Sequence, residues 1–347
     1  MHDLARIAPR RPADCETALR ILFLLPHPIE GPSSRFRVYQ YLPYLEANGF
    51  DCTVRPFLSS AEARGLYSEG GLARKVGLTL KGLSGRVADT LGAGRYDVIF
   101  VLREAFALGP PFVERALMAR GGAFVFDFDD AIYMPSLVHD NPVDRLRDFG
   151  KPAKIVARSD TVIAGSRYLA DWAGRHGANR VEVLPTVVDE TVYRPRLRSG
   201  EEVTLGWIGT PRGSQYVADL KPVFRDLAAR HANLRFVFIG CAPFDAEGLP
   251  VEFRDWSLER EPQDIAGFDI GIMPLTDDEE TRGKCGFKLI QYMASGVAAV
   301  GSPVGVNTEI IEPENSGFFA SDDAGWFEVL DRLVSDPALR ARVAEAG

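Results

Sequence analysis

Short apolar runs alternate along this chain with longer segments of helical period, and the whole pattern begins twice. The first series opens with Arg20–Pro26 and the second with Val203–Ile208, and each run is followed by a turn containing Gly, Pro or Ser and then by a helical segment. This alternation is typical of βα units in a parallel sheet. We therefore predict an α/β chain of two Rossmann-like, doubly wound domains that face a central cleft, with ligands bound beyond the carboxyl ends of the strands.

The 347 residues are enough for two domains with separate cores. We place an N-terminal domain at residues 1–187, an irregular charged linker at 188–200 and a C-terminal domain at 201–347. A helical stretch before Gly49 is expected to kink at Pro43, and Ser214 is expected to cap a helix that continues to His231. The other expected strands are Cys52–Pro56, Asp97–Leu102, Ala123–Asp127, Thr161–Ala164, Val181–Leu184, Arg235–Gly240, Phe268–Met273, Ala298–Gly301 and Gly317–Ala320.

Composition excludes several classes of protein. The net charge of −8 argues against nucleic acid as the main partner, because duplex binding depends largely on neutralising phosphates. The four cysteines lie far apart and without C-x-x-C spacing, so no zinc site is expected and a reducing cytoplasm is the predicted location. Residues 1–19 lack the apolar core of a signal peptide, and no apolar run approaches the ~18–20 residues that span a bilayer.

The segment 281–296, TRGKCGFKLIQYMASG, carries the clearest chemical signal. From Gly286 it has the pattern of a helix in which Lys288 and Gln291 share one stripe, and Lys284 stands just before the first turn. Two lysines beside the free N–H groups of a helix start suit a diphosphate, and Gln291 is placed to hydrogen-bond a ribose. On composition alone, a solvated amphipathic helix whose lysines face water explains the pattern equally well.

The run KLIQYMASGVAAVGSPVGVNTEII resembles the nucleotide-binding segment of glycosyltransferase family 4, the retaining transferases with a GT-B fold. GPSSRFRVYQYLPYL, VIAGSRYLADW, VEVLPTVVD and WIGTPRGSQYV extend the similarity from the first strand to about residue 340. The resemblance implies transfer of a sugar from a nucleotide-sugar donor with retention of configuration. It also implies that the nucleotide-sugar is a substrate, with no separate cofactor and no metal.

The sequence departs from the family at the paired glutamates, where it has Gly283 and Gln291. Glu279 and Glu280 are alternative replacements for the first glutamate, and Glu309 matches a later glutamate of the family. The Arg and Lys that usually follow the first strand of the second domain are absent as a pair. We expect Arg212, Lys284 and Lys288, with the turn at Gly209, to hold the donor diphosphate instead.

In the N-terminal domain, the loop GPSSRFR follows the first strand, where similar loops of the family approach donor phosphates and acceptor. Surface salt bridges are the alternative role for its arginines. Arg103 and Glu104, which follow the strand Asp97–Leu102, are further candidates for this side of the cleft. His27 is interpreted as structural. The predicted acceptor or phosphate residues are Gly31, Ser33, Ser34, Arg35, Arg37, Arg103 and Glu104.

The run FDFDD at 126–130 places carboxylates at the end of a strand. Asp129 and Asp130 are predicted, with Glu280, as catalytic or sugar-binding groups. Helix capping is the alternative for at least one of the two aspartates. Asp127 with Asp129 also forms a D-x-D, which in the other main transferase fold binds a divalent metal, so a metal-dependent transferase is a rival hypothesis.

The basic, loosely amphipathic segment Leu72–Leu91 suits either contact with an anionic membrane or a solvated helix face. The predicted partners are thus a nucleotide-sugar and a carbohydrate or lipid-linked acceptor, with peripheral contact at the inner membrane face. No G-x-G-x-x-G opens either domain, which argues against a nicotinamide-dependent dehydrogenase. The alternative from another class is a catalytically inactive nucleotide- or glycan-binding protein. The family's last helix usually crosses back to the first domain, and this chain ends at Gly347, which predicts either truncation or an abbreviated crossing.

Overall fold

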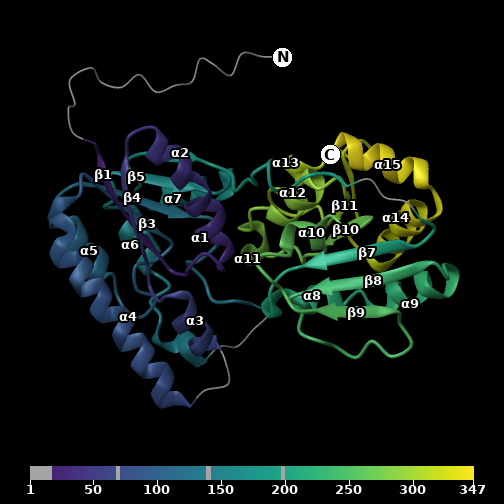
Figure 1. Cartoon of the computed structure of the whole chain (residues 1–347), viewed down its shortest axis with the longest axis horizontal. Coiled ribbons are helices and arrows are strands. Elements are labelled where there is room, and N and C mark those ends of the chain that lie inside the picture. The colour runs from purple at the N-terminus through teal and green to yellow at the C-terminus, as the bar shows by residue number, and fades with distance from the viewer. Residues whose placement is uncertain (1–17, 68–70, 138–141, 197–199) are drawn as a thin grey trace.

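The computed structural model describes residues 18–67, 71–137, 142–196 and 200–347. It contains two six-stranded sheets in which every neighbouring pair of strands is parallel. The first sheet has the order β2-β1-β3-β4-β5-β6 and the second the order β12-β11-β10-β7-β8-β9. The prediction of two doubly wound α/β domains is therefore confirmed (Figure 1).

The strands of the first sheet lie close to their predicted positions. They are β1 (Arg20–Leu25), β2 (Asp51–Pro56), β3 (Val98–Leu102), β4 (Ala123–Phe128), β5 (Thr161–Ala164) and β6 (Val181–Val183). The α-helices of this half are α1 (Pro32–Arg37), α2 (Leu42–Ala47), α3 (Ser60–Tyr67), α4 (Leu72–Gly92), α5 (Phe112–Met118), α6 (Lys151–Val156) and α7 (Arg167–Arg175). Figure 1 shows α4 and α5 on the outside of this half, away from the second sheet.

The second sheet consists of β7 (Val203–Ile208), β8 (Leu234–Ile239), β9 (Val251–Arg254), β10 (Ile270–Met273), β11 (Ala298–Gly301) and β12 (Gly317–Phe319). Its α-helices are α8 (Ser214–Ala218), α9 (Lys221–Arg230), α10 (Glu261–Ile265), α11 (Glu279–Arg282), α12 (Phe287–Ala294), α13 (Asn307–Ile310), α14 (Asp323–Ser335) and α15 (Pro337–Ala346). Helix α15 packs against α14 and β11. The strand β9 was not predicted.

Two helix predictions were wrong in the same way. Instead of one kinked helix, α1 ends at Arg37 and α2 begins anew at Leu42, with Pro43 in its first turn. The helix expected from Ser214 to His231 is likewise divided into α8 and α9, and Pro222 opens the second piece. Proline lacks the N–H that a helix interior needs and is tolerated in a first turn, so each proline marks a new start.

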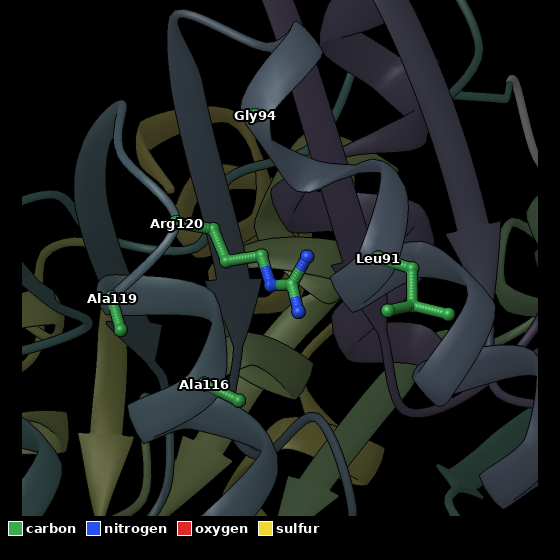
Figure 2. Close-up of a pocket in the computed structure, with 5 residues that line it drawn as sticks. All are labelled: Leu91, Gly94, Ala116, Ala119 and Arg120. Atoms are coloured by element: carbon green, nitrogen blue, oxygen red, sulfur yellow. The ribbon is translucent and has the colours of Figure 1, made fainter.

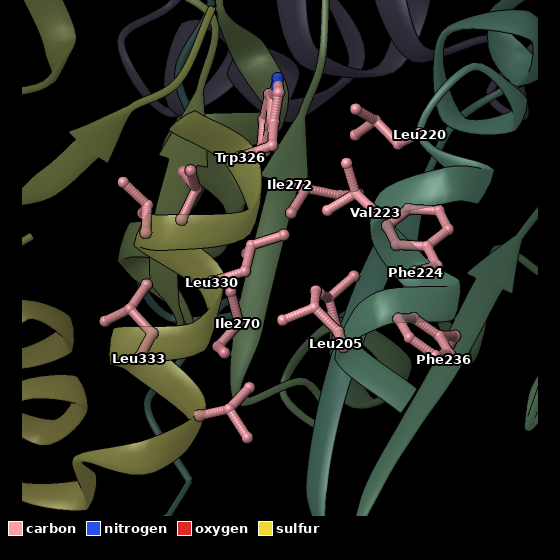
Figure 3. Close-up of a cluster of buried hydrophobic side chains, with 14 of the residues drawn as sticks. Leu205, Leu220, Val223, Phe224, Phe236, Ile270, Ile272, Trp326, Leu330 and Leu333 are labelled. Carbon is pink, nitrogen blue, oxygen red and sulfur yellow. The ribbon is translucent and has the colours of Figure 1, made fainter. Parts of the chain in front are cut away.

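The apolar strands are buried because helices cover both faces of each sheet. In the C-terminal domain, Leu205, Phe236 and Ile270 from the strands meet α9 and α14, which contribute Phe224 and Leu330 (Figure 3). A second cluster on the opposite face contains Leu289 and Tyr292 of α12 and also Phe36 of α1. Phe36 of α1 in the first domain therefore packs against the second domain. Among the described residues, no helix is long and apolar enough to cross a membrane.

Candidate functional site

The loop after β1 and the end of β4 form a network of buried charges in the N-terminal domain. The Arg37 guanidinium donates to both carboxylate oxygens of Asp127, at 2.6 and 3.0 Å, and to the carbonyl oxygen of Leu184 at 2.9 Å. Ser33 donates from Oγ to Asp129 at 2.6 Å. Two of the predicted loop residues, Ser33 and Arg37, thus hold the end of β4. The FDFDD segment is therefore bound by residues of its own domain.

Arg103 occupies the end of β3 in a left-handed conformation, with φ of 60°, which is costly for a residue with a side chain. Its Nε donates to Asp129 at 2.7 Å and its Nη2 to Asp130 at 3.2 Å. Burial opposes ionisation of Asp129, but the charges of Arg103 and Arg37 lower the pKa of that carboxyl. Asp129 is therefore ionised, and its oxygens already accept hydrogen bonds from Arg103 and Ser33. Asp130 is the accessible member, with 37% of its side chain exposed against 5% for Asp129.

These pairings bear on the rival metal hypothesis. Each carboxylate of the D-x-D is already bound to a guanidinium, Asp127 to Arg37 and Asp129 to Arg103. Arg37 bonds to both oxygens of Asp127, and Arg103 and Ser33 each donate to one oxygen of Asp129, so the oxygens that a cation would need already accept hydrogen bonds. Within the described ranges, no group of three or more His, Cys, Asp or Glu side chains is arranged to hold a metal ion.

The remaining predicted residues of this domain have other surroundings. Gly31 packs against His27 so closely that an added Cβ would lie 2.4 Å from the His27 Cβ. Ser34 is buried, and its Oγ has no hydrogen-bond partner among the described residues. Glu104 is buried and pairs with Arg147 at 3.0 Å, with Lys151 also nearby at 3.7 Å. These contacts place Glu104 in an ionic network inside the domain.

On the C-terminal side, the predicted diphosphate residues come from two loops. Gly209 directly follows β7, and an added Cβ there would lie 2.3 Å from the Trp207 ring; the exposed Arg212 comes in the next turn. Lys288 is half-buried in the first turn of α12, with its Nζ 5.6 Å from the centre of the same Trp207 ring. In the part of the chain that the structure describes, Lys288 pairs with no carboxylate. Lys284 lies 3.9 Å from Glu280.

Electrostatic effects connect the two sides. Burial lowers the pKa of His27 to about 4, and the charges of Arg103 and of Arg212 from the other domain contribute. Burial and the charge of Lys284 lower the pKa of Lys288 to about 8, while Asp130 of the N-terminal domain acts in the opposite direction. Groups from both sheets thus share one environment, which we call the junction site: His27, Arg103, Asp129, Asp130, Arg212, Lys284 and Lys288.

Three predicted glutamate and glutamine positions lie around this site in different ways. Glu280 accepts from the Leu137 N–H at 2.7 Å and from Ser136 at 3.3 Å, so it joins α11 to the loop after β4. Gln291 is buried and donates to Glu261 at 3.0 Å. Glu309 is exposed and lies 3.8 Å from Arg167 of the N-terminal domain.

Gly283, where the resemblance implies a glutamate, has no room for a side chain. An added Cβ would lie 2.6 Å from the Cβ of Ala131 and 3.2 Å from its backbone nitrogen. Ala131 belongs to the loop after β4, so the two domains touch at this glycine. The glutamate of the family is excluded here by the packing of the domains.

Sequence reasoning missed the residues around Glu261. This buried carboxylate accepts hydrogen bonds from Arg35, Tyr193, Trp256 and Gln291. Glu261 stands in the charged run LEREPQD, which has the composition of a solvated loop, and Tyr193 stands in the predicted linker. No spacing or motif distinguishes Glu261 from its charged neighbours.

One surface pocket lies away from the junction site. It is lined by Leu91, Gly94, Ala116, Ala119 and Arg120, from the ends of α4 and α5 and the segments after them (Figure 2). These segments lead into β3 and β4, so the pocket is at the amino edge of the first sheet. Side chains from both domains do not meet there, and the carboxyl edge remains the candidate functional site.

Comparisons with known proteins agree with this architecture. The family described as Glycosyl transferases group 1 matches residues 202–336. Among curated proteins, no sequence matches this chain. The solved structure of HepE from Anabaena in complex with UDP and glucose is similar with a TM-score of 0.64 at 16% identity, over 95% of this chain and 93% of that chain.

Two further solved structures are similar over most of their length. Sucrose-phosphate synthase from Thermosynechococcus elongatus has a TM-score of 0.64 at 13% identity, covering 94% of this chain and 92% of that chain. A glycosyltransferase from Rickettsia africae has a TM-score of 0.65 at 12% identity, covering 95% and 92%. Fold and family match together support sugar transfer. This chain therefore has the two-domain GT-B fold, and its C-terminal domain resembles the group 1 glycosyl transferases.

Proposed function

We propose that this protein is a glycosyltransferase that moves a sugar from a nucleotide-sugar donor to a carbohydrate or lipid-linked acceptor. The observation that carries the proposal is Lys288, a half-buried cation without a carboxylate partner among the described residues, at the start of α12. A buried charge is costly unless it is paired, so an anionic ligand is the natural partner of Lys288. The structure of HepE in complex with UDP and glucose is consistent with binding of a nucleoside diphosphate by this fold.

In the proposed reaction, the bond between the sugar and the diphosphate breaks and negative charge develops on the leaving phosphate. Lys288, Lys284 and Arg212 would stabilise that charge electrostatically, and such stabilisation is commonly the largest contribution to catalysis. Asp130 is the accessible carboxylate of the opposite domain and would bind sugar or acceptor hydroxyls. Retention of configuration and independence from metal are proposed from the family resemblance.

The first test is calorimetric and thermal-shift binding of UDP, GDP, ADP and TDP, with and without EDTA. We expect one nucleotide to bind unaffected by EDTA, and Lys288→Ala to weaken it about 10- to 100-fold, because a charge-assisted hydrogen bond contributes ~1.5–3 kcal/mol. Lys154→Ala, at an exposed lysine of α6, is the matched control and should bind normally. If none of the four nucleotides binds, the proposal must be withdrawn.

A catalytically inactive nucleotide- or glycan-binding protein is the second candidate function. It is favoured by Gly283 and Gln291, which leave both positions of the family's paired glutamates uncharged. An assay of donor hydrolysis, in which the released nucleoside diphosphate is measured, distinguishes the active transferase from the inactive binding protein. Binding without any release over a range of acceptors would favour the inactive protein.

We also propose that the protein works in the cytoplasm and that α4 contacts the inner membrane face. Five large apolar side chains of α4 are exposed: Leu72, Val76, Leu80, Val87 and Leu91. They repeat at intervals of mostly four residues, which gathers them on one side of the helix beside the basic Lys75 and Lys81. The described cysteines are all unpaired, which is consistent with a reducing compartment.

Flotation with anionic vesicles tests the membrane contact of α4. The wild-type protein should be recovered with the vesicles, and the double change Leu80→Glu with Val87→Glu should abolish recovery. Recovery unaffected by these changes would refute the role of α4.

A further inference from the structure

Glu261, the first residue of α10, is a buried carboxylate at which four side chains converge, three of them from distant parts of the chain. Its Oε1 accepts from Gln291 Nε2 at 3.0 Å and from the Tyr193 hydroxyl, and its Oε2 accepts from the Trp256 indole N–H. Burial, together with the negative charge of Glu261, raises the pKa of Tyr193, which keeps that hydroxyl a donor. Every direct contact of the carboxylate is thus with a donor.

The fourth donor, Arg35, comes from the other domain. Its Nη2 lies 2.9 and 2.8 Å from the two oxygens of Glu261, and the pair is shielded from water, with 12% and 5% of the side chains exposed. The guanidinium also lies over the rings of Phe36 and Trp256. Because the ion pair is buried and well bonded, Arg35 of α1 holds the Glu261 carboxylate in place from the other domain.

This arrangement determines how the Gln291 amide is oriented. An ionised carboxylate only accepts hydrogen bonds, so the amide must present its NH₂ group to Glu261. Tyr193 lies on the same side, 3.4 Å from Nε2. The carbonyl oxygen of Gln291 therefore points away from Glu261, and no described residue donates a hydrogen bond to it. It is left as an acceptor one turn after Lys288 on the same stripe of α12.

We propose that Glu261 is a positioning residue for the nucleotide: it locks the Gln291 amide so that the carbonyl oxygen accepts a hydrogen bond from a ribose hydroxyl. Arg35 holds the Glu261 carboxylate in place, so the N-terminal domain contributes to nucleotide binding through a residue that does not touch the ligand. Fixing an acceptor before binding lowers the entropy lost on binding. This inference rests on the proposed donor site.

The test exchanges the charge between positions 261 and 291. Gln291→Glu alone places two carboxylates next to each other. Glu261→Gln alone removes the carboxylate that orients the Gln291 amide and leaves Arg35 without its ion-pair partner. The double variant Glu261→Gln with Gln291→Glu restores one carboxylate, one amide and a counter-charge for Arg35. Affinities for UDP, GDP, ADP and TDP are measured by calorimetry, with inorganic diphosphate as a probe that lacks ribose.

For the nucleotide that binds the wild type, we expect each single change to weaken affinity about tenfold. The double variant should bind within about threefold of the wild-type affinity, because substitutions of residues in direct contact have strongly non-additive effects. Diphosphate affinity should change less than twofold in every variant. Glu252→Gln, at an exposed carboxylate on β9 that pairs with Arg254, should bind normally.

Two results would overturn the inference while leaving the donor site in place: additive losses in the double variant, or equal losses of nucleotide and diphosphate affinity. Thermal unfolding of each variant identifies any that do not fold, and rescue by the double variant cannot arise from a general loss of structure. Failure of the wild type to bind any of the four nucleotides would instead overturn the proposed function and this inference together.

Discussion

At the scale of single residues, the junction site contains charges that the protein already pairs and charges that it leaves for a ligand. Asp127 and Asp129 belong to the first kind, because guanidinium groups occupy their oxygens. Lys288 belongs to the second kind, since it pairs with no carboxylate among the described residues and lies over the Trp207 ring. The number of acidic and basic residues in the sequence does not reveal this division.

The lowered pKa of Lys288 predicts how nucleotide binding depends on pH. With a pKa of about 8, Lys288 is charged below that pH and becomes neutral above it. A bound diphosphate favours the charged form and raises the pKa, so affinity should fall as the pH rises through 8, accompanied by proton uptake on binding. Calorimetry in buffers of different ionisation enthalpy measures both. Lys288→Arg, which stays charged, should flatten the profile between pH 7 and about 9; an equally steep profile would contradict the assignment.

The buried pair of Arg37 and Asp127 predicts a large effect on stability. Asp127→Asn removes the charge that compensates Arg37, whose side chain is 1% exposed. We expect the free energy of unfolding, measured with urea, to fall by about 3–5 kcal/mol. Arg180→Ala, which breaks an exposed pair with Glu182, should cost less than about 1 kcal/mol. Equal effects of the two changes would show that burial is not what makes the Arg37 pair important.

At the scale of elements, the connections after the strands position the chemistry. Helix α12 begins only because Gly286 adopts a left-handed conformation, with φ of 63°, which turns the chain from Cys285 into the helix that carries Lys288. The apolar pattern predicted this helix and its starting glycine. It did not predict that the polar stripe with Gln291 is buried as well, because that depends on α10 and on the segment around Tyr193.

We therefore expect Gly286→Ala to be destabilising. The added methyl would lie 2.4 Å from the Ile310 side chain, and the left-handed conformation is itself unfavourable by ~1–2 kcal/mol with a Cβ. Urea unfolding should show a loss of about 1–3 kcal/mol, and nucleotide affinity should fall because Lys288 moves. Gly174→Ala, at a helical glycine of α7 with open space around it, should be neutral or slightly stabilising. Unchanged stability of Gly286→Ala would refute this account of the turn.

At the scale of the whole molecule, the two domains are held together by contacts from every part of the junction. Phe36 packs in the second domain, Glu280 binds the loop at Ser136 and Leu137, and Arg35 pairs with Glu261. Gly283 touches Ala131 with no space for a side chain. The junction is therefore sensitive to a single added carbon atom.

Gly283→Ala should separate the domains locally without affecting either core. Its φ of −80° suits alanine, so any effect comes from contact with Ala131. We expect small-angle scattering to show a larger radius of gyration and the melting temperature to fall. Adding Ala131→Gly removes the nearest atom and should partly reverse both changes, whereas Gly77→Ala, on α4 with open space around it, should change neither. An unaltered scattering profile in Gly283→Ala would mean that the junction adapts without moving.

The fold class, the position of most strands and the cations around α12 could be predicted from the amino-acid sequence, because apolar period, turn residues and helix-start patterns are local properties of the chain. The same patterns place Asp129 and Asp130 at a strand end. Which charges are already paired depends instead on contacts between residues far apart in the chain. Arg37 meets Asp127 across 90 positions and Arg35 meets Glu261 across 226, and no local pattern encodes pairs so far apart. The first pair forms when the strands of one sheet bring their carboxyl ends together, and the second forms when the two domains meet, so the role of Glu261 is apparent only in the folded chain.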